Sequence, residues 1–427
     1  MCIQLEAHAS HNSLHDPYQS AYRKGFSTET ALLKVQNDLL EALDGGSCVA
    51  LLMLDLSTVF DTLDHSIMFQ RLEQHHGITS TALQWFKSYF SARNQRVTVA
   101  EASSGDVNLQ YGVLQGSVLG LKAYTMYTAP LGVILQKNNM QYMMYADDTQ
   151  GYAVIKPQQN WRVTSSALEN CVSEISDWMA CNQLKLNHAK TEYIIFSPRQ
   201  HRPLNPDDYA IQVGTSSLMP AKSVRNLGVI QDSNLTMENQ VSSITKTCYY
   251  HIRRIGKMRS NITSDACKTL VQATITSRLD YANALLYGIP SKLTDRLQMV
   301  QNSAARLVTR TRRRDHITPV LVALHWLPVK YRIRYKVLLY TFKALHETAP
   351  PYICSLVTRH APSRTLRSSS SDLVRMPKSK SKTYGDRAFR VAAATLWNAL
   401  PNELRSTASM MCFKKKLKTH LFRLAYN

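Results

Sequence analysis

A continuous apolar run from Cys48 to Leu54 ends at a carboxylate, Asp55, and this feature constrains the fold more than any other in the sequence. An unbroken apolar run between the turn signal Gly45-Gly46 and an acid is typical of a strand that is covered on both faces. An ionised group next to a buried strand needs a compensating charge, because a lone charge is costly to remove from water. The run therefore predicts a covered sheet with a functional or capping acid at one strand end.

A second acidic feature lies on a predicted hairpin. Between Met140 and Ile155 an apolar strand, the pair Asp147-Asp148 and a second strand follow one another, which places both acids at the hairpin tip. Taken singly, such acids are more often turn formers or helix caps. Taken together with Asp55, they suit two-metal phosphoryl transfer, because Mg²⁺ prefers carboxylate oxygens and two ions lie roughly 4 Å apart in such sites. The three acids can converge only if the strand ending at Asp55 lies beside the hairpin.

Helical periodicity dominates much of the remaining chain. Ser27 is a candidate cap for a first helix, and Glu29 suits the positive end of its dipole. The apolar spacing predicts further helices over 80–90, 264–287 and 292–309, and a last one in which Phe413, Leu417 and Leu421 share a face behind a lysine run at 414–416. A short strand is predicted at 97–99.

Positive charge is concentrated in the second half of the chain. The whole sequence has 51 Lys and Arg against 30 Asp and Glu, a net charge of +21. Residues 1–200 have 14 basic and 18 acidic side chains, whereas residues 201–427 have 37 and 12. Four of those cations are arginines at 310 and 312–314, directly after a predicted helix. This bias favours a polyanionic partner such as nucleic acid.

Several classes of protein are disfavoured by what the sequence contains. The longest apolar run is far shorter than the roughly 20 residues of a membrane helix, and the first residues do not have the layout of a signal peptide. The eight cysteines form no CxxC pair, so neither a disulfide framework nor a zinc ribbon is indicated. We therefore expect an intracellular protein, nuclear or cytoplasmic, without a membrane partner.

Three motifs resemble motifs A, B and C of the reverse transcriptases of LINE-type (non-LTR) retrotransposons: DLSTVFDTLDH from residue 55, GVLQGSVLG from 112 and YADDTQ from 145. SAYRKGFSTETALL, SARNQRV, WMACNQLKLNHAKTEYIIF, VRNLGVIQDSNL and the C-terminal LHWLPVKYRI, LWNALP and FKKKLKTHLF extend the resemblance. It implies an α+β fold: a right-hand palm of antiparallel sheet plus helices with partial fingers, then a mainly helical, basic thumb and C-terminal region. The implied activity is RNA-directed DNA synthesis on an RNA template, from a DNA primer and deoxynucleoside triphosphates.

The resemblance also implies roles for single residues. Asp55 and Asp147 would hold two Mg²⁺ ions, or Mn²⁺, with Asp148 as the adjacent acid. Lys190 matches a lysine that protonates pyrophosphate, although an isolated lysine is usually a solvated surface charge.

The resemblance also implies contacts to the incoming nucleotide in motifs A and B. Phe60 would exclude a 2′-hydroxyl, although an aromatic residue after a strand is also a common core residue. The other implied contacts are Ser57, Thr58 and Val59 near the triphosphate, and Gln115, Gly116 and Ser117 in the motif B loop.

Some positions depart from the family pattern. Leu114 stands where the family has proline, which loosens the motif B loop. Lys122 falls where an apolar helix residue is expected, and an unpaired buried charge there would be costly. Only 54 residues precede Asp55, so the sequence resembles an N-terminally truncated reverse transcriptase without the first finger motif or an endonuclease. A second interpretation is therefore a catalytically inactive remnant that binds nucleic acid through its basic half.

The expected domains follow from these motifs and from shifts in composition. Residues 1–17 are expected to be a poorly ordered remnant, 18–205 to form partial fingers and palm, 206–345 to hold motif E and a helical thumb-like region, and 346–427 to form a basic C-terminal region with a linker at about 363–383.

Overall fold

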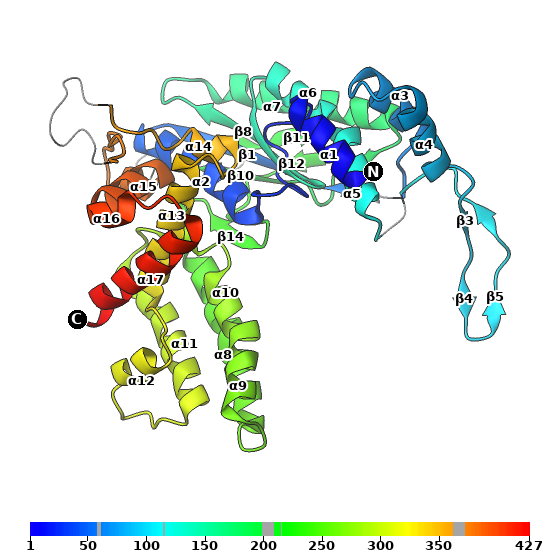
Figure 1. Ribbon diagram of the computed structural model, residues 1–427. Helices are drawn as coiled ribbons and strands as arrows, with labels where there is room; N and C mark the ends of the chain where they lie inside the picture. Colours follow the sequence, from blue (N-terminus) through cyan, green and yellow to red (C-terminus); the bar gives the residue numbers. More distant parts are fainter. Residues whose placement is uncertain (58–60, 114–115, 199–208, 215, 362–371) are drawn as a thin grey trace. The chain divides into compact units, whose positions relative to one another are not determined.

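The computed structural model describes residues 1–57, 61–113, 116–198, 209–214, 216–361 and 372–427. The chain divides into two compact units, which are considered separately (Figure 1). The sheet unit comprises Met1–Phe26, Val49–Ile195 and Pro203–Ala221. The helical unit comprises Ser27–Cys48, Phe196–Arg202 and Lys222–Asn427.

The sheet unit contains, in chain order, α1 (Cys2–His11), β1 (Cys48–Leu54), β2 (Leu56–Ser57), α3 (His65–Gln74), α4 (Ser80–Phe90), β3 (Asn94–Gln95), β4 (Thr98–Val99), β5 (Ala102–Ser103), β6 (Val107–Asn108), α5 (Val118–Thr128), α6 (Pro130–Lys137), β7 (Gln141–Tyr145), β8 (Asp148–Ile155), α7 (Trp161–Cys181), β9 (Lys185–Leu186), β10 (Glu192–Phe196), β11 (Ile211–Val213) and β12 (Ser216–Leu218).

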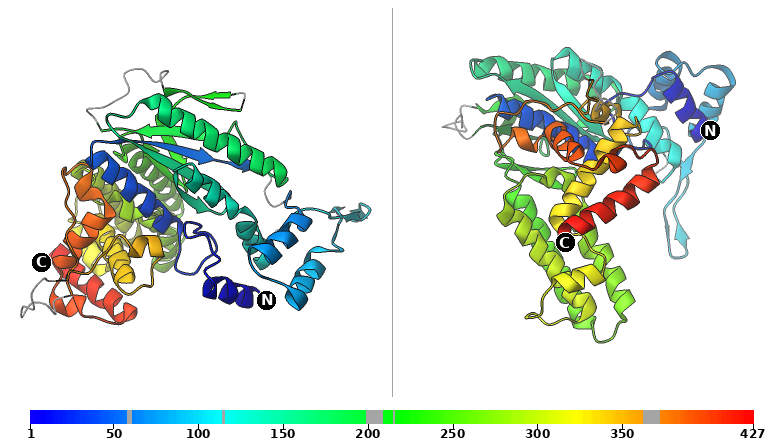
Figure 2. Two further views of the ribbon diagram at one scale, coloured as in Figure 1. Left: turned by 90° about the horizontal axis from the view of Figure 1, so that it is seen from above. Right: turned by 60° about the vertical axis from the view of Figure 1, so that its left-hand side comes forward.

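A four-stranded sheet in the order β10-β1-β8-β7 forms the centre of this unit. β7 and β8 are antiparallel, with Tyr145 opposite Asp148 at the turn. Helices α6 and α7 pack against β7 and β8, and Figure 2 shows α7 lying along the strands. The core is made where apolar faces meet, for example at Leu51 of β1, Met143 of β7 and Ile175 of α7, which are fully buried. The predicted strand 48–54, the hairpin and the helix at 80–90 are confirmed.

The N-terminal segment forms a helix, α1, rather than the poorly ordered remnant expected for residues 1–17. Leu5 and Ala9 are buried on one side of α1. His8 Nε2 lies 2.7 Å from the carbonyl of His76, which joins the helix to the loop after α3. Burial of two apolar residues and this polar contact give the segment a reason to be ordered that its polar composition does not indicate.

Within the described residues, one segment, Val118–Lys137, is long and apolar enough to cross a membrane by length and composition. It consists of α5 and α6, and 56% of its most apolar window is buried inside the fold. Tyr124 and Tyr127 of α5 and Leu131 of α6 are fully buried. This burial is what a core helix requires, and it accounts for the apolar composition.

The helical unit contains α2 (Thr28–Asp44), β13 (Ser223–Asn226), β14 (Val229–Asp232), α8 (Glu238–Met258), α9 (Ser264–Val271), a π-helical turn (Gln272–Thr276), α10 (Ser277–Asp280), a 3₁₀ turn (Asn283–Leu286), α11 (Ser291–Thr309), α12 (Thr318–Ala323), α13 (Val329–Leu345), α14 (Pro351–Cys354), a second 3₁₀ turn (Gly385–Arg387), α15 (Phe389–Asn398), α16 (Asn402–Arg405) and α17 (Met410–Tyr426). The helix predicted over 264–287 is therefore interrupted rather than continuous.

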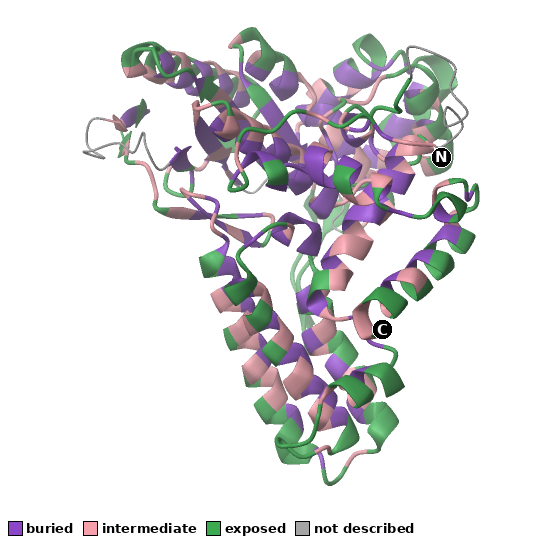
Figure 3. Cartoon of the chain, turned by 90° about the vertical axis from the view of Figure 1, so that its left-hand side faces the viewer, coloured by how far each residue is buried: buried purple, intermediate pink, exposed green. Residues whose placement is uncertain are grey.

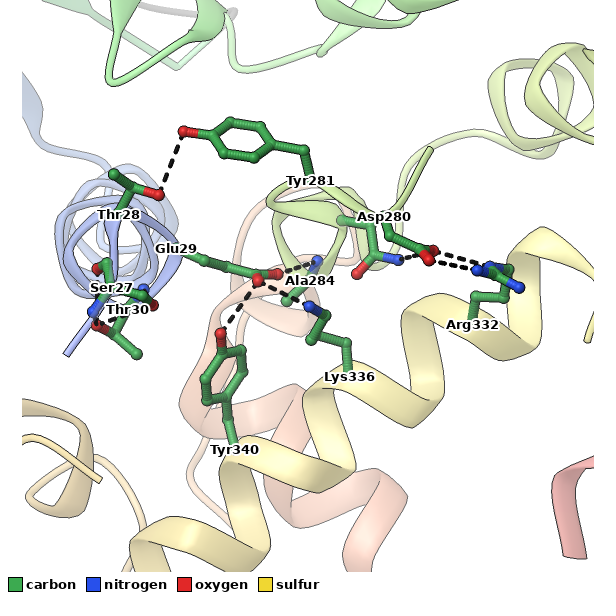
Figure 4. A network of polar contacts seen from close by, with 11 residues as sticks. Ser27, Thr28, Glu29, Thr30, Asp280, Tyr281, Ala284, Arg332, Lys336 and Tyr340 are labelled. Carbon is green, nitrogen blue, oxygen red and sulfur yellow. Dashed lines mark hydrogen bonds and ion pairs between the residues drawn. The ribbon is translucent and has the colours of Figure 1, made fainter. Parts of the chain in front are cut away.

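Helix α2 belongs to the helical unit, although the motifs in the sequence predict that it is part of the palm. Ser27 caps it as predicted: its hydroxyl accepts from the Thr30 N–H at 3.2 Å. Glu29 does more than face the helix dipole, because its side chain is only 8% exposed and is held by α13 (Figure 4). Tyr340 donates to Glu29 Oε2 at 3.0 Å, and Lys336 Nζ lies 3.1 Å from the same oxygen. A buried carboxylate with these partners ties α2 to α13.

An aromatic cluster fixes the last helix of the chain. The rings of Phe342 on α13 and Phe413 on α17 stack with centroids 4.2 Å apart, and Trp397 of α15 packs on Phe413 at 5.7 Å. Phe413, Leu417 and Leu421 are buried, as their spacing predicts, whereas the lysine run at 414–416 is exposed. The positive charge of α17 is therefore on its outer face.

Candidate active site

The sheet brings the three predicted acids together. Asp55 directly follows β1, and Asp147 and Asp148 lie at the turn between β7 and β8. β1 and β8 are neighbours in the sheet, which is the adjacency that convergence requires. The negative charges of Asp147 and Asp55 both act on Asp148. Three carboxylates from two separate parts of the sequence thus form one acidic site.

This arrangement disfavours the ionised form of Asp148. Partial removal from water, followed by the charges of Asp147 and Asp55, raises the pKa of Asp148 to about 6. Its side chain is nevertheless exposed to solvent. Nearby, burial and the charge of Asp147 also raise the pKa of Tyr124. The site therefore concentrates negative charge that a cation would relieve.

The hairpin turn that presents these acids is held by Gln19, a residue that no sequence motif indicates. Ala146 has a φ of +58°, a left-handed conformation that is uncommon for a non-glycine residue. The buried side chain of Gln19 accepts from the Ala146 N–H at 3.0 Å and donates to its carbonyl at 3.3 Å. Residues on either side of Gln19 also pair with β7: the Ser20 N–H donates to the carbonyl of Met144. In the sequence, the only indication of this region is the finger motif SAYRKGFST, which begins directly after Gln19.

Asp55 is positioned by the loop after β9. Asn187 donates its side-chain N–H to Asp55 Oδ2 at 3.3 Å and its backbone N–H to the Asp55 carbonyl at 2.9 Å. The Lys190 N–H donates to the Asn187 carbonyl, which closes a turn. Lys190 Nζ then lies 3.7 Å from Asp55 Oδ2. The structure thus brings Lys190 to the acids, and it adds Asn187, which lies in the quoted motif LKLNHAKT.

The backbone conformation of the motif B loop accounts for the glycine at position 116. Gly116 has a φ of +85°, which strains any residue with a Cβ, although there is open space where a Cβ would lie. Ser117 caps α5 by accepting from the Gly120 N–H at 3.0 Å. Gln115 lies outside the described residues, as do Thr58, Val59 and Phe60 of motif A. The backbone of Ser57 pairs with Lys185 in the small β2–β9 ladder.

Lys122 is not the unpaired buried charge that is expected from the sequence. Its Nζ forms an ion pair with Glu6 of α1, and its side chain is 12% exposed. His15 Nε2 also lies 3.3 Å from Glu6. The expected penalty is therefore offset by a carboxylate from a segment 116 residues away, which no local pattern indicates.

The donor chemistry of the site fits hard divalent ions. Among the residues that the structure describes, no three His, Cys, Asp or Glu side chains form a ready-made metal cluster. Asp55, Asp147 and Asp148 nevertheless supply oxygen donors only, and partial burial together with the charges of Asp147 and Asp55 raises the pKa of Asp148. Carboxylate oxygens without nitrogen or sulfur ligands are the set that Mg²⁺ and Mn²⁺ prefer.

A sheet that carries acids from a strand end and from the tip of an adjacent hairpin, flanked by helices, defines the palm of a polymerase of the right-hand class. The family model for reverse transcriptase (RNA-dependent DNA polymerase) matches residues 1–231. The chain belongs to this reverse transcriptase family, and its resemblance to non-LTR retrotransposon enzymes is confirmed.

Curated relatives include a probable RNA-directed DNA polymerase from transposon BS of Drosophila melanogaster, 23% identical over 305 residues, and the RNA-directed DNA polymerase from mobile element jockey of Drosophila funebris, also 23% identical over 305 residues. Each match covers 68% of this chain and 32% of the relative, so the chain spans about a third of their length. Among solved structures, apo telomerase from Candida tropicalis matches with a TM-score of 0.42 and 10% identity, over 81% of this chain and 57% of that one.

Proposed function

We propose that this chain is the catalytic core of an RNA-directed DNA polymerase of a non-LTR retrotransposon. Its reaction is template-directed addition of a deoxynucleoside monophosphate to a primer 3′-hydroxyl, with release of pyrophosphate. The observation that carries the proposal is the convergence of Asp55 with Asp147 and Asp148, since three exposed or half-buried acids at one sheet edge serve no evident purpose in folding. RNA template, DNA primer and deoxynucleoside triphosphates are the proposed partners, and the location is intracellular.

Catalysis in this proposal relies on positioning. Gln19 holds the turn before Asp147, and Asn187 holds the carboxylate of Asp55, so the acids do not have to be ordered when substrate arrives. Lys190 has an exposed side chain next to Asp55, and it would donate a proton from Nζ to an oxygen of the leaving pyrophosphate.

Asp55, Asp147 and Asp148 would hold two Mg²⁺ ions, with Mn²⁺ as a substitute. When bound, the ions supply Lewis-acid activation of the attacking hydroxyl and neutralise charge on the leaving oxygen. The three side chains would fulfil their part only when ionised, and because the pKa of Asp148 is raised, a bound cation would favour the ionised form of this residue.

An inactive remnant that only binds nucleic acid is the second candidate, favoured by the net positive charge of residues 201–427. The pairing of Lys122 with Glu6 weakens it, because that lysine no longer argues for a damaged motif B helix.

Primer extension on an RNA template distinguishes the two candidates. The wild type should extend a DNA primer with Mg²⁺, and Asp147→Asn should lower the rate by about a thousandfold, equivalent to several kcal/mol of lost metal stabilisation. Asp177→Asn, an exposed position on α7, is the matched control and should extend normally. If the wild type and Asp147→Asn do not differ with metal present, the polymerase proposal fails and the remnant is the better account.

A further inference from the structure

The first segment of the chain, residues 1–15, is attached to the rest of the sheet unit by little apolar surface, and we call it the N-terminal latch. The strands at the centre of the sheet unit are largely buried (Figure 3), whereas only Leu5 and Ala9 are buried in α1. A helix of ten residues has little stability of its own in water. The docking of the N-terminal latch therefore depends strongly on its polar contacts.

Two polar contacts join the N-terminal latch to the helices beside it. Glu6 forms an ion pair with Lys122 of α5. His8 Nε2 lies 2.7 Å from the carbonyl of His76, in the loop after α3. Within the latch, Nε2 of His15 lies 3.3 Å from the carboxylate of Glu6. Three histidines are thus gathered where the latch meets its neighbours.

The surroundings of His15 and His76 are rich in cations. Both residues line a cavity of about 460 Å³. Its other titratable lining residues are Asp16, Arg71 and His75. A smaller cavity that shares the same two histidines is also lined by Arg23 and Lys122. A proton added to either ring would therefore lie among groups of the same sign.

His76 is held in its neutral form while the latch is docked. Its side chain is buried, with 5% of the residue exposed. This burial lowers the pKa of His76 to about 4, although the carbonyl of Met126 opposes the shift. The charges of His75, His15 and His8 lower the pKa further. Protonation of His76 is thus disfavoured in the docked arrangement.

His15 behaves in the same way within the latch itself. Burial and the charges of Arg23 and Lys122 lower the pKa of His15, and Glu6 only partly opposes them. If the latch leaves, water reaches His15 and His76, and each pKa returns towards its ordinary value of 6.5. The released state therefore binds more protons than the docked state, so docking weakens as pH falls from about 6.5 towards 4.

We propose that the N-terminal latch is an acid-sensitive switch, docked at neutral pH and released when His76 and His15 take up protons. Release removes Glu6 from Lys122, whose side chain is only 12% exposed on α5. Because α5 is the helix that Ser117 caps at the end of the motif B loop, the switch acts on that helix. The direction is opposite to the effect of Asp148, so the local protection of α1, rather than global unfolding, reports the latch.

Hydrogen exchange of the full chain, measured at pH 7.5 and pH 5.0 and corrected for the intrinsic exchange rate, tests the proposal. Protection of the α1 amides should fall by about twentyfold to thirtyfold, as expected for one histidine whose pKa is 6.5 when released and about 4 when docked. Helix α7 of the same unit should keep its protection at both pH values. Loss of protection in α7 as well would mean that the whole unit unfolds, and unchanged protection of α1 would mean that no switch exists. Either result overturns the proposal.

Substitution of the two histidines separates this switch from a general effect of acid. His76→Gln removes the group with the strongly lowered pKa, and it should reduce the pH dependence of α1 protection to less than about fivefold. His11→Gln is the matched control, because His11 is an exposed histidine of the same helix, and it should keep the wild-type dependence. If His76→Gln does not dock at pH 7.5, His15→Gln decides, since it leaves the contact between His8 and residue 76 in place and should also reduce the dependence. A wild-type dependence in both His76→Gln and His15→Gln would overturn the proposal, independently of primer extension.

Discussion

The side-chain amide of Gln19 satisfies both backbone polar groups of Ala146, at 3.0 Å for the N–H and 3.3 Å for the carbonyl. Ala146 is buried and left-handed, so its N–H and carbonyl cannot turn to water or to the hairpin ladder. Asp147 is the next residue. The conformation that presents Asp147 to the site therefore depends on a glutamine 127 residues earlier in the chain.

Gln19→Ala should damage both stability and activity. It leaves two buried backbone groups without partners, so the free energy of unfolding should fall by about 1–3 kcal/mol in urea denaturation. Displacement of Asp147 should lower kcat for primer extension by roughly tenfold to a hundredfold at temperatures where the variant is folded. Gln159→Ala, which removes an exposed glutamine, is the matched control. An unchanged kcat in folded Gln19→Ala would show that the clamp is only structural.

Lys190→Ala should slow the chemical step more than substrate binding. General acid catalysis contributes typically 10²–10⁴-fold, so we expect a loss of kcat on the order of a hundredfold with a small change in KM. Lys185→Ala removes an exposed lysine from the neighbouring strand β9 and should leave the rate intact. A KM effect without a kcat effect would contradict the proton-donor role.

Asp148 should make the metal-free chain less stable as pH rises towards neutrality. Its folded pKa of about 6 lies above the ordinary value of 3.8, so between these values the folded state binds more protons than the unfolded state. The contribution of this group to the free energy of unfolding therefore falls as pH increases from about 4 through 6. Urea denaturation in EDTA should show this slope in the wild type and a shallower slope in Asp148→Asn. Asp177→Asn, at an exposed site, should retain the wild-type slope, and equal slopes in all three proteins would refute the assignment.

Glu29→Ala should strongly destabilise the helical unit. It removes the shared partner of the Ala284 N–H, the Tyr340 hydroxyl and the Lys336 ammonium. Loss of one member of a buried charged network costs about 3–5 kcal/mol, which thermal or urea unfolding would detect. Glu238→Ala is a matched control, since Glu238 also lies in the first turn of a helix but is exposed. Its loss should cost no more than about 1 kcal/mol. Similar losses in both variants would mean that only the helix dipole matters.

The local sequence pattern was sufficient to predict many of the helices and strands. The apolar run 48–54 is β1, the cap at Ser27 starts α2, and the spacing of Phe413, Leu417 and Leu421 marks the buried face of α17. These elements follow from periodicity and capping, which act over a few residues. The helix predicted over 264–287 was wrong in its continuity, because a π-helical turn at Gln272–Thr276 and a 3₁₀ turn interrupt it.

The candidate site also contains some residues that can be predicted from the sequence and others that cannot. Asp55, Asp147, Asp148 and Lys190 could be named from motifs, and the sheet order and the contact between Lys190 and Asp55 bring them together. The residues that support them, Gln19 and Asn187, have no pattern of their own, because an amide side chain that pairs with a distant backbone leaves no periodic trace in the sequence.

What the sequence by itself determined is the identity of the acids, the strands and helices that carry them, and the division of charge between the two halves of the chain. Only the tertiary structure decided which buried polar groups are satisfied. Lys122, expected to be an unpaired charge, is paired with Glu6, and Glu29, expected to face a helix dipole, holds two helices together. The physical reason is that the cost of a buried charge depends on the partner that folding brings to it, and these partners lie 116 and more than 300 residues away.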